Sequence, residues 1–117
     1  MANVAIADPI TWDKILYVGT DHVWTCRRVD TNLNPIIPDE AFAQIRNKPY
    51  GVLWVDIDVT VDPVDGWITC TVPKEYTADP DWQGRKAGVW DIEVILDGNR
   101  LRWVHGAVTV SQEVTLS

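Results

Sequence analysis

Few residues in this chain could take part in nucleophilic catalysis. Hydrolysis by an activated serine or cysteine needs a base within reach and a third group that orients the base. The sequence offers only His22 and His105 as histidine bases, and it contains no Gly-x-Ser-x-Gly motif. Both histidines fall in segments that alternate like β-strands. We therefore interpret them as side chains on strand faces and predict that the chain is not an enzyme.

Candidate ligands for zinc are as scattered as the catalytic groups. A zinc site needs three or four converging Cys, His or carboxylate ligands. His22 and Cys26 share a strand face by their spacing but supply only two ligands. Cys26 and Cys70 are interpreted as small buried hydrophobic residues, with a disulfide between two facing sheets as the alternative. The sequence therefore predicts neither a zinc site nor a cofactor.

The densest acidic group surrounds one strand-like segment and the turn after it. Asp56 and Asp58 project from one face of residues 52–61, and Asp62 and Asp65 belong to the turn. Calcium prefers such oxygen-rich places, although the loop pattern of an EF-hand is absent. We interpret the group as a solvated face, with a weak calcium site as the alternative. Paired carboxylates also cleave glycosidic bonds, but nothing in the sequence indicates the groove that this reaction needs.

Tryptophan is unusually frequent, with seven residues against one Phe and one Met. Some of these side chains must lie in the core, and the others are candidates for an interface, where tryptophan is enriched. Trp54 and Trp67 fall on the polar side of their strands and would together form a patch for protein or carbohydrate, unless a second sheet or a loop covers them. The interface candidates are Trp12, Trp54, Trp67 and Trp82.

The elements that would position these residues are short strands. No segment longer than about eight residues has a helical period, and Pro and Gly interrupt the chain at short intervals. The alternation of strands is clearest in 52–61, 67–72, 88–96 and 100–110, and shorter strands are expected at 15–18 and 22–29. Asp97-Gly98 favours a tight hairpin turn between the last two of the long strands.

The connections carry weaker signals. Residues 30–38 read as a polar loop, and 41–46 fit either a helical turn or a strand. Within the long connection 73–86, Asp79 followed by Pro80 predicts a capped helical turn. Gly106 marks a bulge or a close approach of two backbone segments.

About six to eight strands separated by regular turns predict an all-β fold. The expected architecture is a single antiparallel β-sandwich of immunoglobulin-like type with long connecting loops. Residues 1–117 form one domain by length, with an extended arm at 1–13 and a tail at 111–117.

The net charge of −7 excludes some partners. Nucleic acid needs clustered Lys and Arg to neutralise its phosphates, so we expect no nucleic-acid partner. Anionic membranes are disfavoured for the same reason, and no apolar run approaches the roughly 20 residues of a membrane span. We expect a protein partner instead.

The C-terminal third carries a pattern of a known family. It runs from Gly88-Val89-Trp90-Asp91-Ile92-Glu93-Val94 through Asp97-Gly98 to Arg102-Trp103-Val104-His105-Gly106-Ala107-Val108-Thr109-Val110 and Val114-Thr115. Together with Gly66-Trp67-Ile68-Thr69 and the opening hairpin at 19–28, it resembles the LtfC-type β-sandwich family of tailed-bacteriophage virion proteins. It is also similar to the amino-terminal domain of baseplate upper proteins.

The resemblance implies a virion structural protein, assembled in the host cytoplasm. The expected role is that of a minor capsid or decoration protein that docks on the major capsid protein, forms homo-oligomers on the particle and stabilises the shell. An accessory role in the tail, neck or baseplate is the alternative. A carbohydrate-binding module is the alternative from another class, and it would use Trp54 and Trp67.

Overall fold

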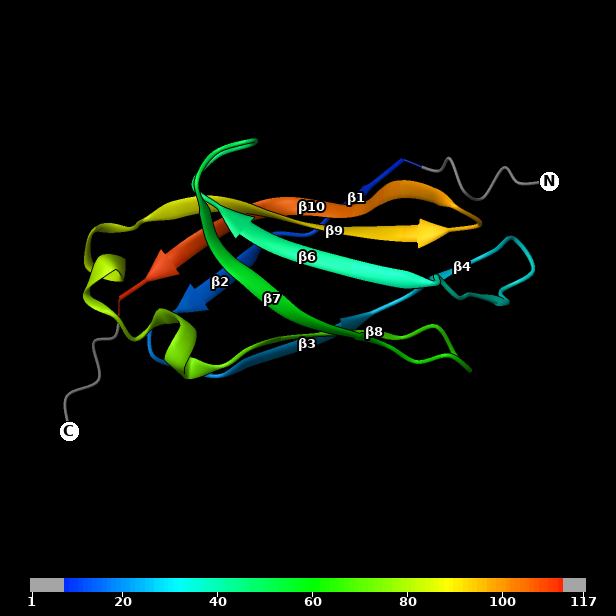
Figure 1. The fold of residues 1–117 in the computed structure, drawn as a ribbon, viewed down its shortest axis with the longest axis horizontal. Coiled ribbons are helices and arrows are strands. Elements are labelled where there is room, and N and C mark those ends of the chain that lie inside the picture. The colour runs from blue at the N-terminus through cyan, green and yellow to red at the C-terminus, as the bar shows by residue number, and fades with distance from the viewer. Residues whose placement is uncertain (1–7, 113–117) are drawn as a thin grey trace.

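Ten strands and two short 3₁₀ helices make up the structure, a computed structural model that describes residues 8–112 (Figure 1). The elements in chain order are β1 (Ile10–Thr11), β2 (Lys14–Tyr17), β3 (His22–Cys26), β4 (Arg28–Val29), β5 (Pro35–Ile36), β6 (Glu40–Arg46), β7 (Leu53–Val61), β8 (Ile68–Val72), η2 (Lys74–Thr77), η3 (Pro80–Gly84), β9 (Ala87–Leu96) and β10 (Asn99–Ser111). The predicted all-β class is confirmed. Across residues 8–112, no helix has the length and apolar character needed to cross a membrane.

Eight strands belong to one continuous sheet, in the order β1-β10-β9-β6-β7-β8-β3, with β2 also paired to β10. The sheet curls at the long strand β7. Its first half pairs with β6 and its second half pairs with β8, so the chain passes from one layer to the other within a single strand. Figure 1 shows β8 and β3 below the layer that contains β9 and β10. The sandwich-like interior therefore arises from one curled sheet.

The sheet is mixed, which corrects the expectation of a wholly antiparallel sandwich. β1 and β2 both run parallel to β10, whereas the other pairings are antiparallel. Parallel neighbours cannot be joined by a tight hairpin. Nearly the whole described chain lies between β2 and β10, and that separation is what permits the parallel pairing.

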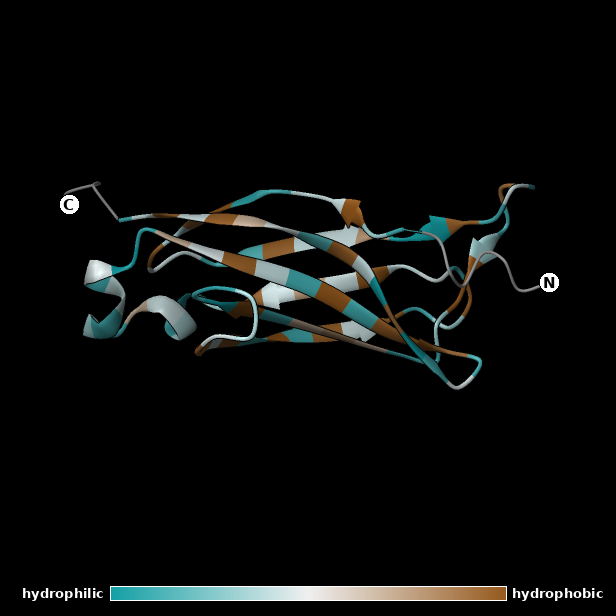
Figure 2. Ribbon diagram, turned by 90° about the horizontal axis from the view of Figure 1, so that it is seen from above, coloured by the Kyte–Doolittle hydropathy of each residue, from teal (hydrophilic) through white to brown (hydrophobic). Residues whose placement is uncertain are grey.

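The alternating pattern of apolar residues on the strands builds the core (Figure 2). On β8, Ile68, Cys70 and Val72 are fully buried, and on β9 the buried residues recur at every second position from Gly88 to Leu96. The interior also holds aromatic contacts between layers. Trp24 of β3 meets Trp90 of β9 edge-on, with 5.4 Å between the ring centroids.

The structure settles one segment that the sequence left open and corrects the bounds of another. Residues 41–46, which fitted either a helical turn or a strand, belong to β6, and this strand has a partner on each side. The single strand expected at 22–29 is instead divided into β3 and β4. β3 pairs with β8, whereas β4 turns away to pair with β5, inside the segment expected to be a loop.

The turn predictions are confirmed. Asp97 and Gly98 adopt φ angles of 53° and 81°, as a two-residue hairpin turn requires. The Asp79 side chain accepts a hydrogen bond from the backbone N–H of Asp81 and caps η3. Gly106 lies against the carbonyl oxygen of Trp12, so the close backbone approach is confirmed, while the β10 bulge lies between Arg102 and Val104.

Candidate binding surfaces

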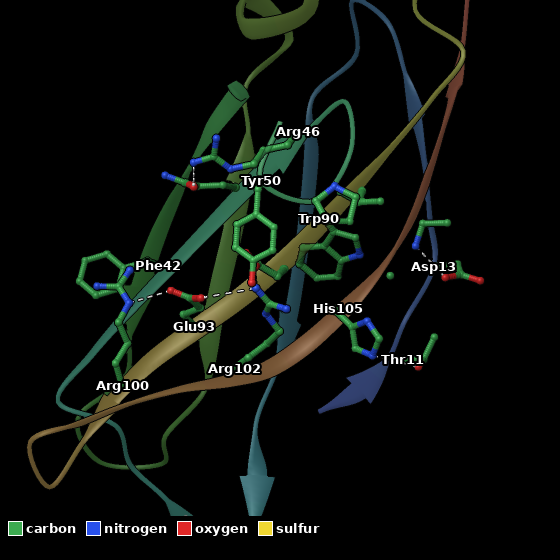
Figure 3. Close-up of a pocket in the computed structure, with 16 residues that line it drawn as sticks. Thr11, Asp13, Phe42, Arg46, Tyr50, Trp90, Glu93, Arg100, Arg102 and His105 are labelled. Atoms are coloured by element: carbon green, nitrogen blue, oxygen red, sulfur yellow. Dashed lines mark hydrogen bonds and ion pairs between the residues drawn. The ribbon is translucent and has the colours of Figure 1, made fainter. Parts of the chain in front are cut away.

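A groove of about 750 Å³ lies on the outer face of β6, β9 and β10 (Figure 3). The register of these strands places their outward side chains in three rows across the sheet. In the order β10, β9, β6, the rows are Arg102–Glu93–Phe42, His105–Asp91–Gln44 and Ala107–Val89–Arg46. Charged and amide side chains therefore occupy the floor of the groove beside a single aromatic ring from β6.

Ion pairs hold the charged side chains of the floor in place. Arg100 Nε lies 2.7 Å from Glu93 Oε1, and Arg102 Nη2 lies 3.2 Å from Asp91 Oδ2. Arg102 also approaches Glu93 Oε2 at 3.8 Å, so one guanidinium serves both carboxylates. Burial raises the pKa of Asp91 above its ordinary value, and Arg102 opposes this effect. The floor consequently presents oriented donors and acceptors.

Arg46 fixes the wall formed by the β6–β7 loop. Its guanidinium donates to the carbonyl oxygen of Gly51 at 2.8 Å and to Gln44 Oε1 at 2.7 Å. Within residues 8–112, Arg46 forms no ion pair with a carboxylate. Asn47 Oδ1 accepts from the backbone N–H of Val52 at 2.8 Å and closes the same loop. The loop is thereby held beside the groove by its own hydrogen bonds.

Tyr50 stands at the rim of the groove, on that loop. Its side chain is almost completely solvent-accessible, with the residue 94% exposed. Its φ angle of 60° lies in the left-handed region, which residues other than glycine rarely adopt. Because the ring is almost fully exposed, it buries little apolar surface and contributes little to the stability of the fold.

The opposite wall comes from the N-terminal part of the chain. Thr11 Oγ1 lies 3.4 Å from His105 Nε2, and Asp13 Oδ1 accepts from the backbone N–H of Ala107 at 2.9 Å. β1 and the residues that follow it are therefore joined to β10 along this side. His105 lies within the groove, on a strand face as predicted.

A second surface surrounds the two ends of the curled sheet. β2 and β3 follow each other in the chain but pair with β10 and β8, not with each other. Apolar side chains are exposed on both strands: Ile15 is 53% exposed and Val23 is 64% exposed, with Tyr17 between them in the sequence. We call these three residues and the two strand edges the open seam.

Lys14 lies beneath the open seam. Its Nζ atom is 4.0 Å from the centroid of the Trp12 ring and 4.8 Å from that of Trp24. Burial lowers the pKa of this lysine. The Trp24 indole N–H is buried and has no hydrogen-bond partner among the described residues. The cation and two aromatic faces therefore fill the space between the layers at this end.

The structure separates the four tryptophans expected at an interface. The prediction that Trp82 lies at an interface is wrong, because this residue is only 1% exposed. It packs against Trp54, with 5.6 Å between the ring centroids. Trp12 is half-buried against Trp90. Trp67, 40% exposed, lies under Arg27 at the other end of the β7–β8 hairpin.

Trp54 and Trp67 do not form the expected patch. Trp67 pairs with Asp62 at the end of the hairpin, eight residues along the strand from Trp54. At the rise of an extended strand this places the two rings roughly 26 Å apart. Trp54 is also half-buried, against Gly88 and below Arg85. A sugar ring cannot bridge the two tryptophans.

The acidic residues proposed as a weak calcium site are also not gathered. Among residues 8–112, no group of three or more His, Cys, Asp or Glu side chains could hold a metal ion. Asp58 accepts a hydrogen bond from the Tyr76 hydroxyl at 2.9 Å, and Asp62 accepts from the backbone N–H of Val64 at 2.8 Å. Asp56 and Asp65 lie apart, on the strand and in the turn. The four carboxylates therefore do not converge on one point in the described part of the chain.

Cys26 and Cys70 lie in neighbouring strands of one sheet, not in facing sheets. The register opposes Cys26 to Ile68 and Cys70 to Trp24, so the two thiols are diagonal neighbours and both are free. His22 does not join Cys26 in a metal site. Its Nε2 instead lies 3.0 Å from the backbone N of Tyr17 and 3.2 Å from the Tyr17 carbonyl oxygen.

The sequence analysis missed the groove. Only its residues from 89–93 and 100–107 belonged to predicted strands, whereas Tyr50 and the wall at Thr11 and Asp13 lay outside them. Alternation indicates that Gln44, Asp91 and Arg102 point the same way relative to their own strands. It does not indicate that β6 and β10 flank β9. No protein-family model matches the sequence, and no curated protein matches it. The resemblance to phage virion proteins therefore stays a prediction. The groove and the open seam are the two surfaces on which a partner or ligand could bind.

Proposed function

We propose that this protein is a non-catalytic structural protein of a tailed-bacteriophage virion. In the most direct form of the proposal it is a minor capsid or decoration protein that docks on the shell and stabilises it. The observation that carries the proposal is the open seam, where two strand edges lie beside exposed apolar side chains. The resemblance of the β9–β10 hairpin region to phage β-sandwich proteins supports the same role.

The open seam has the features of a protein-docking surface. A strand at the end of a sheet offers unpaired N–H and C=O groups to an extended segment of another chain. Natural proteins protect such edges with charged residues, which lie on the edge or point inward. β2 carries the inward-facing Lys14, whereas β3 contains no Lys, Arg, Asp or Glu. Here the outward residues of β3 are Val23 and Thr25, and those of β2 are Ile15 and Tyr17. Because His22 already contacts the backbone N–H and carbonyl of Tyr17, an extended segment of a capsid or tail protein would pair with the edge of β3 and cover these apolar groups.

The net charge of −7 fits a protein displayed in many copies. Like charge keeps free copies apart, whereas docking on the particle brings them together in a fixed arrangement. Copies arranged by the symmetry of a shell would meet as trimers or higher rings. A role in the tail, neck or baseplate would use the same surface with fewer copies.

Quantitative mass spectrometry of purified particles tests the proposal. Copies are counted against the major capsid protein. Hundreds of copies support the decoration role, and a few to a few dozen support a tail, neck or baseplate role. Absence from intact particles would reject the virion assignment.

A charge placed on β3 tests the open seam as the docking surface. We expect Val23→Lys to reduce the number of copies retained on particles at least tenfold, because the lysine would be buried against the partner strand. Val64→Lys is the matched control, since Val64 is 74% exposed in the β7–β8 turn. Equal retention of both variants would show that docking does not use β3.

A further inference from the structure

We propose that the groove on β6, β9 and β10 is a binding site for a neutral carbohydrate. This site is distinct from the open seam and does not depend on the virion role. The sequence suggested carbohydrate binding at Trp54 and Trp67, which the structure places apart. The groove instead brings polar side chains and an exposed aromatic ring together.

The charge balance of the groove favours a neutral ligand. Its lining contains three arginines and three carboxylates, namely Arg46, Arg100, Arg102, Asp13, Asp91 and Glu93. A polyanion would meet the carboxylates, and a polycation would meet the arginines, so neither gains a net attraction. A polyhydroxylated ligand can donate to a carboxylate and accept from a guanidinium at once.

The polar groups of the floor are already oriented before a ligand arrives. Arg102 is shared between Asp91 and Glu93, and Arg100 pairs with Glu93. Each of these groups can make more hydrogen bonds than it makes in the free protein. A ligand therefore need not order flexible side chains, which is one of the main costs of binding. Gln44 and His105 extend the same row of donors and acceptors to both sides of Asp91.

Tyr50 supplies the apolar element that a sugar site requires. The face of a pyranose ring is lined by C–H groups, which pack on an aromatic ring while the hydroxyls at the ring edge bind polar groups. Tyr50 is 94% exposed, and hydrogen bonds within its loop hold it at the rim. Its ring is not packed against the core, so the aromatic face is available to a ligand.

The first experiment applies the full-length protein to an array of immobilised oligosaccharides of hexoses and N-acetylhexosamines, with sulfated and uronate-containing oligosaccharides beside them. We expect binding to neutral members. The strongest binder is then titrated in solution and followed by ¹H–¹⁵N NMR. Amide shifts should concentrate in 42–52, 89–93 and 100–107. The proposal is overturned by binding to no member, by a preference for the charged members, or by shifts centred elsewhere.

Variants separate the groove from the rest of the surface. Tyr50→Ala and Arg102→Gln should each weaken binding of that oligosaccharide about tenfold or more, as loss of a principal contact implies. Tyr17→Ala is the matched control, because Tyr17 is an exposed tyrosine of β2 outside the groove. Its affinity should equal that of the unaltered protein. Unchanged affinity in Tyr50→Ala and Arg102→Gln would overturn the proposal.

Sedimentation velocity tests the competing occupant, a second copy of the chain. The proposal expects the same sedimentation coefficient for the unaltered protein and for Tyr50→Ala. A dimer that dissociates on Tyr50→Ala would assign the groove to self-association and overturn the carbohydrate proposal. Neither result depends on whether the protein is found in virions, so the two proposals can fail separately.

Discussion

The thiols of Cys26 and Cys70 illustrate how a local environment controls reactivity. Burial raises the pKa of Cys70 to about 12 and also raises that of Cys26, although Lys14 opposes both shifts. The thiolate is the reactive form of cysteine. Both residues are therefore held in their unreactive form near neutral pH.

We expect both thiols to stay free and to react slowly in the folded protein. Diagonal neighbours across antiparallel strands are about 7–8 Å apart, beyond the usual Cα separation of a disulfide. Titration with a thiol reagent in denaturant, without reductant, should detect two thiols per chain. The same titration at pH 8 in native buffer should proceed far more slowly. Fewer than two thiols in denaturant would contradict the register of β3 and β8.

The environment of Asp91 predicts a measurable dependence of stability on pH. Its pKa is raised in the folded state, mainly by burial, so the folded protein binds a proton more readily than the unfolded chain does. The free energy of unfolding contributed by this group is therefore present at low pH and is lost as the pH rises from near 3.8 through the raised pKa.

The substitution Asp91→Asn removes this titration. We expect the variant to lose less stability than the unaltered protein as the pH rises from about 4 to 7, because it carries no charge to desolvate. Urea unfolding across this range measures the difference. A steeper loss in Asp91→Asn would show that the ion pair with Arg102 outweighs burial.

At the scale of elements, the contact between β10 and the segment after β1 is the tightest constraint on this edge of the sheet. A Cβ atom at Gly106 would overlap the carbonyl oxygen of Trp12, which already accepts a hydrogen bond from the Trp90 indole N–H at 2.7 Å. Backbone atoms cannot move aside as a flexible side chain can. The glycine is therefore required by the parallel pairing of β1 and β2 with β10.

We expect Gly106→Ala to lower the free energy of unfolding by about 1–3 kcal/mol, as overpacking does in other folds. Gly84→Ala is the matched control, because a Cβ there meets open space and the backbone is not left-handed. Its effect should stay within about 0.5 kcal/mol. Urea unfolding of both variants provides the measurement. Equal effects would contradict the close approach at Gly106.

Predictability also differs among elements. The β9–β10 hairpin and the η3 cap could be predicted, since Asp97-Gly98 and Asp79-Pro80 act on their own neighbours. Residues 41–46 could not be assigned, because a run of six residues is too short for its pattern to distinguish a helical turn from a strand. In β6 only Ala43 and Ile45 are buried. The pairing of β6 with β7 and β9 decided that it is a strand.

At the scale of the whole molecule, stability should fall from the middle of the curled sheet to its two ends. β9 and β6 have partners on both sides, whereas β3 and β2 lie at the ends. We expect amide hydrogen exchange to be slowest in 90–95 and 43–45 and fastest among strands in 22–26. Exchange measured by NMR tests this order. Uniform protection across β3 and β9 would show that the free protein closes the open seam, for instance by self-association.

The sequence by itself determined the all-β class, the main strands, the hairpin turn and the inward-facing side of β7, β8 and β9. These properties depend on alternation and turn chemistry over a few neighbouring residues. In β10 the bulge between Arg102 and Val104 changes which alternate residues face the core. Only the tertiary structure decided that Trp82 is buried, that Trp54 and Trp67 lie apart and that Arg102 meets Asp91 and Glu93. Such contacts depend on strand order and register. Both result from packing between segments far apart in the chain, on which a local period of two carries no information.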